Sequence, residues 1–164
     1  MSSEENKAVV RRFITQVFEN GQVEAVDELV SPDFMMHSVP DAKPGSQPLK
    51  DAMARVKQGL SQVSMRIEDL VVEGDKVAVR LTAHACQSGE FMGMPPSNRE
   101  YTVAEMHLFT VRDGRIQEHW AVVDFLSIMK QLGALPEGPQ AKPGAASRPA
   151  RPTASRGRKE KAAR

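Results

Sequence analysis

The spacing of apolar residues changes at Ser61 from a helical to a strand period, and this change leaves few folds open to the chain. Before it, apolar residues recur every three or four positions; after it, they alternate with polar ones. The first part predicts three helices, over residues 4–20, 22–30 and 49–60. Helices followed by antiparallel strands are typical of an α+β fold.

The second part predicts two hairpins. Residues 65–72 and 76–86 flank the turn sequence EGDK, and residues 101–111 and 115–124 flank Asp113-Gly114. The segment SGEFMGMPPSNRE between them is rich in Gly and Pro and predicts a long loop. A helical turn over 125–132 closes the domain. One curved sheet wrapped over its helices would enclose a cone-shaped pocket.

The charge distribution divides the chain into an acidic body and a basic tail. Eight of the 22 basic residues but one of the 21 acidic residues lie after residue 140, so the body carries a formal charge of −6. We expect a folded domain over residues 1–137 and a disordered tail over 138–164. The tail could neutralise nucleic-acid phosphates, but it has no aromatic residue for base stacking, so a solvated extension is the preferred interpretation.

Other features exclude whole classes of protein. A single cysteine, Cys86, rules out an internal disulfide and fits a reducing cytoplasm. The acidic N-terminus does not resemble a signal peptide, and no segment approaches the ~18 apolar residues of a membrane span. We therefore expect a cytoplasmic protein without a membrane partner. The four histidines lack metal-binding spacing, and no phosphate or dinucleotide fingerprint occurs, so we expect no metal or cofactor.

The second hairpin predicts a cluster of acids, a histidine and the only tryptophan. A two-residue turn at Asp113-Gly114 pairs Arg112 with Arg115, and alternation then puts seven residues on one face. These are Glu105, His107, Phe109, Glu118, Trp120, Val122 and Asp124. A polar cluster with aromatic walls suits a small-molecule site. The same alternation directs His84 and His119 outward. A one-residue bulge would exchange the faces.

Asp124 has two interpretations. Burial between Trp120 and Phe125 would raise its pKa from ~3.9 and suit it to removing a proton next to a carbonyl. Alternatively, its side chain caps the helix that follows. His107 is the first candidate to donate a hydrogen bond to an enolate oxygen, although a lone histidine also serves as a core residue. Gln87 and His37 are further candidates.

The segment EHWAVVDFLSIMKQLG resembles the closing strand and helix of SnoaL-like polyketide cyclases, or ester cyclases, of the nuclear-transport-factor-2-like superfamily. The opening NKAVVRRFITQVFENGQVEAVDELVSPDFMMHS resembles their first helices. GEFMGMPPSNREY resembles their G-x-F-x-G-x-P-P-T-G loop, and FTVRDGRIQEHW their penultimate turn. The resemblance extends from Lys7 to Pro136. Gln87 stands where the family often has a histidine, which puts any role of that histidine in doubt.

This resemblance implies a cone-shaped α+β barrel with one deep pocket, usually as a homodimer or homotetramer. It implies that Asp124 is the general acid/base of an intramolecular aldol ring closure without metal or organic cofactor. We expect Trp120 and Phe91 to line the pocket, with Glu105, Gln87 and His37 contributing to substrate binding.

The leading hypothesis is a cofactor-independent lyase, isomerase or cyclase acting on a polyketide-like substrate. The alternative is a non-catalytic ligand-binding or association domain of the same fold. A third possibility is hydration or hydrolysis by water activated at Asp124.

Overall fold

The structure is a computed structural model that describes residues 2–135. Helix α1 (Ser3–Phe13) begins with a capping box, in which the Ser2 hydroxyl accepts from the Glu5 amide and the Glu5 carboxylate accepts from the Ser2 amide. It continues into a π-helical segment, η1 (Ile14–Glu19). The first predicted helix is therefore confirmed in position and length.

The second predicted helix is shorter than its pattern indicated. It consists of η2 (Val23–Ala25) and α2 (Val26–Leu29), after which the chain turns extended in β1 (Val30–Met36). This strand contains Pro32, which an edge strand tolerates because its unpaired side needs no amide donor. The third predicted helix is confirmed as α3 (Gln47–Gly59).

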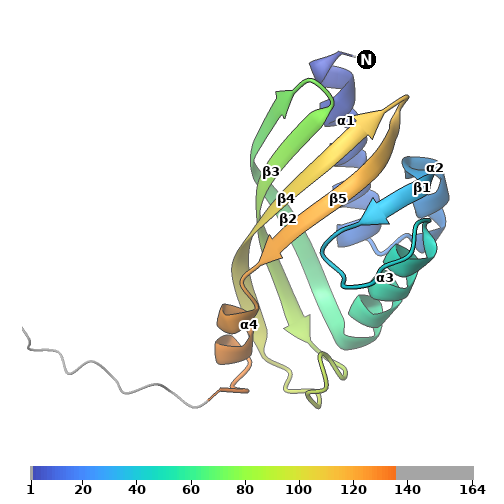
Figure 1. Cartoon of the computed structure of the whole chain (residues 1–164). Coiled ribbons are helices and arrows are strands. Elements are labelled where there is room, and N and C mark those ends of the chain that lie inside the picture. Colours follow the sequence, from blue (N-terminus) through green and yellow to red (C-terminus); the bar gives the residue numbers. More distant parts are fainter. Residues whose placement is uncertain (1, 136–164) are drawn as a thin grey trace, which may run out of the picture.

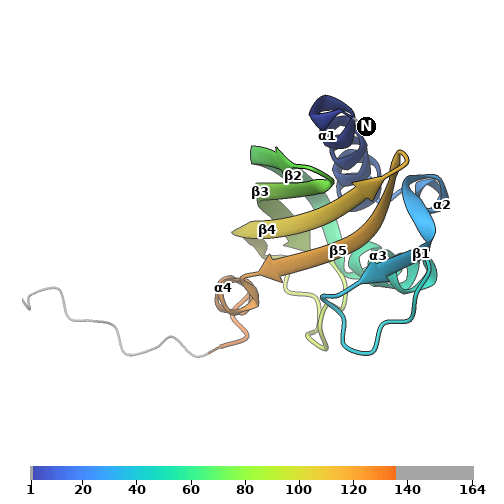
Figure 2. The same ribbon diagram turned by 45° about the horizontal axis from the view of Figure 1, so that its top comes forward.

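Four long strands follow, and they form one sheet with β1. They are β2 (Leu60–Glu73), β3 (Lys76–Gln87), β4 (Glu100–Arg112) and β5 (Arg115–Val123). The strand order is β1-β5-β4-β3-β2, with β1 parallel to β5 and the other pairs antiparallel. The sheet curves around α1 and α3 without closing, and α4 (Phe125–Gln131) lies at its lower end (Figures 1 and 2). The predicted curved α+β architecture is confirmed.

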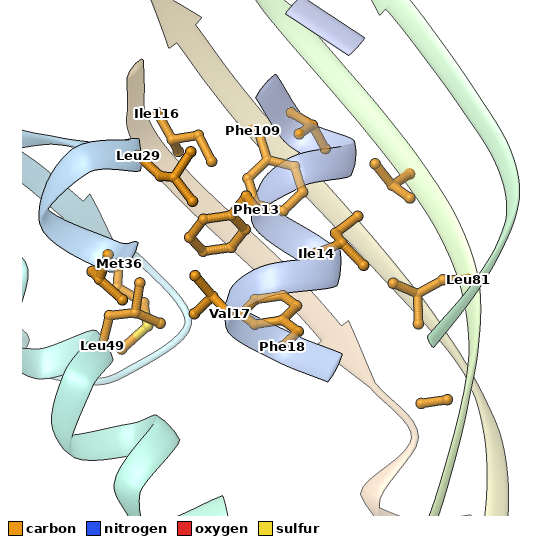
Figure 3. Close-up of a cluster of buried hydrophobic side chains, with 14 of the residues drawn as sticks. Phe13, Ile14, Val17, Phe18, Leu29, Met36, Leu49, Leu81, Phe109 and Ile116 are labelled. Carbon is orange, nitrogen blue, oxygen red and sulfur yellow. The ribbon is translucent and has the colours of Figure 1, made fainter. Parts of the chain in front are cut away.

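The core lies between the concave face of the sheet and the first helix. Phe13, Ile14, Val17 and Phe18 project from α1 and η1 toward strand residues such as Phe109 (Figure 3). The rings of Phe13 and Phe109 meet edge to face, with centroids 5.6 Å apart. All five side chains are buried, so this contact fixes the helix against the sheet.

A one-residue bulge in β5 corrects the predicted faces of the second hairpin. The turn pairs Arg112 with Arg115 as predicted, but the register then shifts at Gln117, so Phe109 lies opposite His119 instead of Glu118. Along the rest of β5 the inward and outward positions are consequently exchanged. His119, Ala121 and Val123 face inward, whereas Glu118, Trp120 and Val122 face outward.

Within residues 2–135, no helix combines the length and the apolar character needed to cross a bilayer. The predicted tail over 138–164, together with its possible contact with nucleic acid, lies outside the described residues.

Candidate active site

A cavity of about 290 Å³ lies between the concave face of the sheet, α3 and α4. Its walls are largely apolar, and apart from Ser38 and His84 its polar side chains come from one strand, β4. The principal apolar lining residues are Phe18, Met36, Met53, Val56, Leu60, Val63, Met65, Phe91, Val123, Phe125 and Ile128. Tyr101, Glu105 and His107 add a phenol, a carboxylate and an imidazole. A few convergent polar groups in an apolar hollow are typical of a small-molecule site.

A chain of hydrogen bonds runs from this cavity into the protein. Glu105 Oε2 lies 3.0 Å from His107 Nε2, and His107 Nδ1 lies 2.9 Å from Nε2 of His119. The side chain of His107 is 3% exposed and that of Glu105 is 11% exposed. Both nitrogens of His107 are thus occupied inside the protein. Glu105 Oε1 accepts no hydrogen bond from any described residue, so this oxygen is available to a ligand.

Burial determines the protonation of two groups beside this chain. Desolvation by burial, with smaller contributions from the neighbouring imidazoles of His107 and His37, lowers the pKa of His119 to about 3, so this imidazole is neutral. Desolvation, assisted by the negative charge of Glu105, raises the pKa of Tyr101 to about 12. The phenol therefore stays protonated and can donate a hydrogen bond inside the cavity.

Asp124 is not in the environment that the sequence suggested. It is exposed and caps α4: Oδ1 accepts from the Ser127 amide at 2.9 Å and Oδ2 from the Ser127 hydroxyl at 2.6 Å. These bonds lower its pKa, the opposite of the expected direction. The expected burial is wrong because the bulge at Gln117 shifts the phase of β5. The helix-cap interpretation is confirmed.

Trp120 and His37 lie together on the outer face of the sheet and do not line the cavity. Their rings stack with centroids 4.2 Å apart, and His37 Nε2 lies 3.4 Å from Glu118 Oε1. The ammonium of Lys76 lies 5.0 Å from the centre of the Trp120 ring. The phase shift at Gln117 accounts for the outward position of Trp120. His37 lies beside Trp120 because β1, which precedes His37, pairs with β5.

Gln87 holds a loop instead of facing the cavity. It is 1% exposed; its amide nitrogen donates to the carbonyls of Met94 and Pro95, and its amide oxygen accepts from the Ser97 hydroxyl at 2.7 Å. Three side-chain hydrogen bonds of Gln87 thus fix the segment that the sequence predicted as a loop. The expected substrate contact is replaced by this structural role.

Phe91 and His84 lie where the sequence placed them. Phe91 lines the cavity and also a more open hollow of about 600 Å³ bounded by Arg55, Gln58, Glu90 and Met92. Phe91 therefore stands where the two spaces adjoin. His84 contacts the cavity only at its edge, since its neighbours Ala83 and Ala85 are the buried ones and its Nδ1 lies 3.1 Å from the Thr102 hydroxyl.

Two residues of this cluster, Tyr101 and His119, were not predicted from the sequence. Tyr101 shares the strand face of Glu105 and His107 at two-residue spacing, so alternation alone could have identified it. His119 could not be placed inward without knowledge of the bulge. No group of three or more His, Cys, Asp or Glu residues within 2–135 is arranged to hold a metal ion.

A curved sheet over helices with an acid–histidine pair in an apolar cavity defines a small-molecule site on a nuclear-transport-factor-2-like fold. A family model described as SnoaL-like polyketide cyclase matches residues 8–132, and the chain belongs to this family.

Relatives of characterised activity and a solved structure agree with this assignment. The chain is 27% identical over 124 residues to the nogalonic acid methyl ester cyclase of Streptomyces nogalater, covering 73% of this chain and 92% of that one. It is 28% identical over 133 residues to the aklanonic acid methyl ester cyclase AcmA of Streptomyces galilaeus, covering 79% and 91%. The structure of TsrD from Streptomyces laurentii superimposes with a TM-score of 0.75 at 28% identity, covering 82% of this chain and 99% of that one.

Proposed function

We propose that this protein is a cofactor-independent cyclase that closes a ring in a polyketide-like ester, with Glu105 as the general base. The relatives are named for ring closure of nogalonic and aklanonic acid methyl esters. The observation that supports this role most directly is the Glu105–His107 pair, which places a carboxylate oxygen at an apolar cavity wall.

The chemistry requires a base, a donor and a dry cavity. Glu105 Oε1 would take a proton from a carbon next to a carbonyl, and the electron pair would move to the carbonyl oxygen as an enolate. The Tyr101 hydroxyl would donate to that oxygen. The enolate carbon then attacks a second carbonyl of the same molecule, one carbon–carbon bond forms, and the new alkoxide takes the proton back from Glu105. Protons and electrons balance within the substrate and these residues.

The two adjoining spaces suit an elongated substrate. A cavity of about 290 Å³ would hold the reacting part, and the hollow of about 600 Å³ beyond Phe91 would hold the remainder. The apolar walls would also strengthen the interaction between the carboxylate and the acidic carbon, because little water competes there.

The decisive comparison is between Glu105→Gln and Asp124→Asn, since each keeps the shape of its side chain and removes the charge. General base catalysis contributes about 10²–10⁴-fold, so Glu105→Gln should lower kcat by that factor. Asp124→Asn should leave kcat within about twofold of the parent. Loss of activity in Asp124→Asn alone would return the role to Asp124.

Non-catalytic ligand binding remains the second candidate, because His107 has both ring nitrogens occupied and Asp124 is engaged in a cap. It predicts that an aklanonic-type methyl ester binds in the cavity but undergoes no ring closure. Because Trp120 lies outside the cavity, binding is followed through a spectroscopic signal of the ligand itself. Turnover sensitive to Glu105→Gln contradicts it.

We further infer that two copies of the chain associate through the outer face of the sheet. Met106 lies opposite Val122 and Leu108 opposite Trp120, and Met106, Leu108 and Val122 are 49%, 37% and 73% exposed. Ion pairs of both signs flank these residues, Lys76–Glu118 and Arg80–Asp69. A face with an apolar centre and both charges at its rim can be complementary to a second copy of itself.

A further inference from the structure

His119 is buried directly behind the catalytic pair without lining the cavity. It is 4% exposed, and its ring stacks on those of Phe109 at 4.7 Å and His107 at 5.2 Å. The ring of Phe18 lies 5.7 Å away on another side. The backbone carbonyl of His119 also accepts from the His37 amide at 2.9 Å. The ring is therefore held in one orientation by packing and by two strands.

Only one nitrogen of His119 has a hydrogen-bond partner. Nε2 faces His107 Nδ1 at 2.9 Å, whereas Nδ1 is buried and meets no donor or acceptor among the described residues. A neutral imidazole carries a single hydrogen, on one nitrogen or the other. The choice between them sets the proton on His107 as well.

The two positions of the hydrogen on His119 differ in free energy, because they leave different buried groups unpaired. With the hydrogen on Nδ1, His119 would bury an unpaired N–H, and His107 Nδ1 would have to donate to His119 Nε2. A neutral His107 would then present a bare Nε2 to the Glu105 carboxylate. With the hydrogen on Nε2, His119 donates to His107 Nδ1, and His107 donates from Nε2 to Glu105. Only an acceptor lone pair is left unpaired, which proteins tolerate better than a buried unpaired donor.

We propose that His119 is a positioning residue that fixes His107 as its Nε2–H tautomer and opposes a second proton on His107. For His107 to become an imidazolium, its Nδ1 would need a hydrogen, which collides with the hydrogen already donated by His119. His107 thus stays neutral and donates to Glu105, and the Glu105 carboxylate remains a base. The catalytic consequence rests on the function proposed above; the tautomer does not.

Few other titratable groups face this pair. Glu105 and Tyr101 lie on the same strand, and His37 follows β1 on the far side of β5. The residue of β3 opposite His107 is Val79, and η1 presents Phe18, so both of these elements are apolar at the contact. The state of His107 is therefore governed mainly by Glu105 and His119.

The test uses two substitutions at the same position. His119→Gln keeps an N–H donor near the position of the His119 Nε2 atom, whereas His119→Leu keeps the bulk of the side chain and removes the donor. Ring ¹⁵N chemical shifts of the whole chain without ligand report the tautomer. We expect His107 as Nε2–H at pH 7 in the parent and in His119→Gln. In His119→Leu the neutral form loses its donor, so the imidazolium of His107 should appear at higher pH than in the parent.

An Nδ1–H tautomer or an imidazolium of His107 in the parent at pH 7 would overturn the proposal, and this spectrum is decisive even if His119→Leu does not fold. An unchanged titration of His107 in a folded His119→Leu would overturn it as well. The kinetic counterpart is the pH profile of kcat/KM for ring closure. Its acid limb should move to higher pH in His119→Leu and stay in place in His119→Gln.

These readouts separate this inference from the proposed function. If Glu105→Gln retains full turnover while the ¹⁵N spectra match expectation, the function fails and the tautomer assignment stands. If Glu105→Gln is inactive while His119→Leu leaves both spectrum and pH profile unchanged, the positioning role fails and the function stands.

Discussion

At the scale of single residues, the two carboxylates considered as the general base, Asp124 and Glu105, have opposite surroundings. Asp124 is exposed and accepts two hydrogen bonds from Ser127, which favour its charged form and lower its pKa. Glu105 is largely buried at a cavity wall and bound to one buried histidine. A base acts on a bound molecule only if it reaches that molecule, and on this ground Glu105 is the better placed.

Replacing Asp124 should affect stability and not chemistry. Asp124→Ala removes both acceptors from the start of α4, so the urea midpoint should fall, whereas Asp124→Asn keeps an oxygen that can cap and should resemble the parent. Urea unfolding and turnover are measured on the same preparations. A loss of turnover in Asp124→Asn with an unchanged midpoint would contradict this prediction.

Burial of His119 should make stability depend on pH below neutrality. The pKa of its side chain is about 3 in the folded protein against 6.5 for a solvated histidine, so the unfolded chain binds more protons as the pH falls. The contribution of His119 to the free energy of unfolding is therefore fully present above pH 6.5 and is lost as the pH falls toward 3. At pH 5 the loss amounts to about 2 kcal/mol.

Unfolding of the parent and of His119→Gln in urea at pH 7.5 and pH 5 measures this contribution. The parent should lose about 2 kcal/mol more than the variant between the two pH values. Equal losses in both proteins would mean that His119 is not the group that takes up the proton.

At the scale of secondary-structure elements, the sequence predicts the hairpins well and the faces of one strand badly. The Asp113-Gly114 turn and the pairing of Arg112 with Arg115 follow from local turn chemistry, and both are confirmed. The bulge at Gln117 has no comparable signal, because a surplus residue in a strand of mixed polarity leaves the alternation intact on either side. Glu105, His107 and Phe91 were thus placed correctly, while Trp120 and Asp124 were not.

Gln87 shows a second limit of sequence reasoning. Its position corresponds to a histidine of the family, but its side chain makes three hydrogen bonds to a loop that folds back only in three dimensions. Sequence spacing gave no information on that return.

Replacing Gln87 should loosen the loop over residues 88–99. Gln87→Leu removes the side-chain donor from the Pro95 carbonyl and one of the two donors from the Met94 carbonyl, which should cost about 1–3 kcal/mol. Amide hydrogen exchange should accelerate at Asn98, whose amide donates to the Gln87 carbonyl, and at its neighbours in the loop. Gln117→Leu is the matched control, because its side-chain amide also donates to two carbonyls, those of Arg112 and Arg115, and it should leave hydrogen exchange in the 88–99 loop unchanged.

At the scale of the whole molecule, the helices that precede the sheet in the sequence pack on one of its two faces. This arrangement determines where the cavity lies and which face of the sheet is left uncovered. Helices α1 and α3 lie on the concave face of the sheet (Figure 2). The cavity lies between this face, α3 and α4. The convex face is covered by no described element and exposes Met106 and Val122. This division followed from the period change at Ser61, which is why the fold could be predicted from the sequence.

The proposed association through the convex face predicts that a charge there separates the copies. Met106→Asp should convert the parent from a dimer to a monomer in size-exclusion chromatography with light scattering. Met92→Asp is the matched control, since Met92 is 52% exposed against 49% for Met106 but lies in the loop beside the open hollow, away from the convex face. A parent that is monomeric at high concentration, or a dimer that persists in Met106→Asp, contradicts the association.

The most direct test of the catalytic assignment is the rate of ring closure of nogalonic or aklanonic acid methyl ester by the parent, Glu105→Gln and Asp124→Asn. Disappearance of the open-chain ester is followed at saturating substrate, with the fold of each variant checked by circular dichroism. The account predicts that Glu105→Gln loses about 10²-fold or more in kcat and that Asp124→Asn loses less than about twofold. A Glu105→Gln variant that is correctly folded and closes the ring at the parental rate would contradict it.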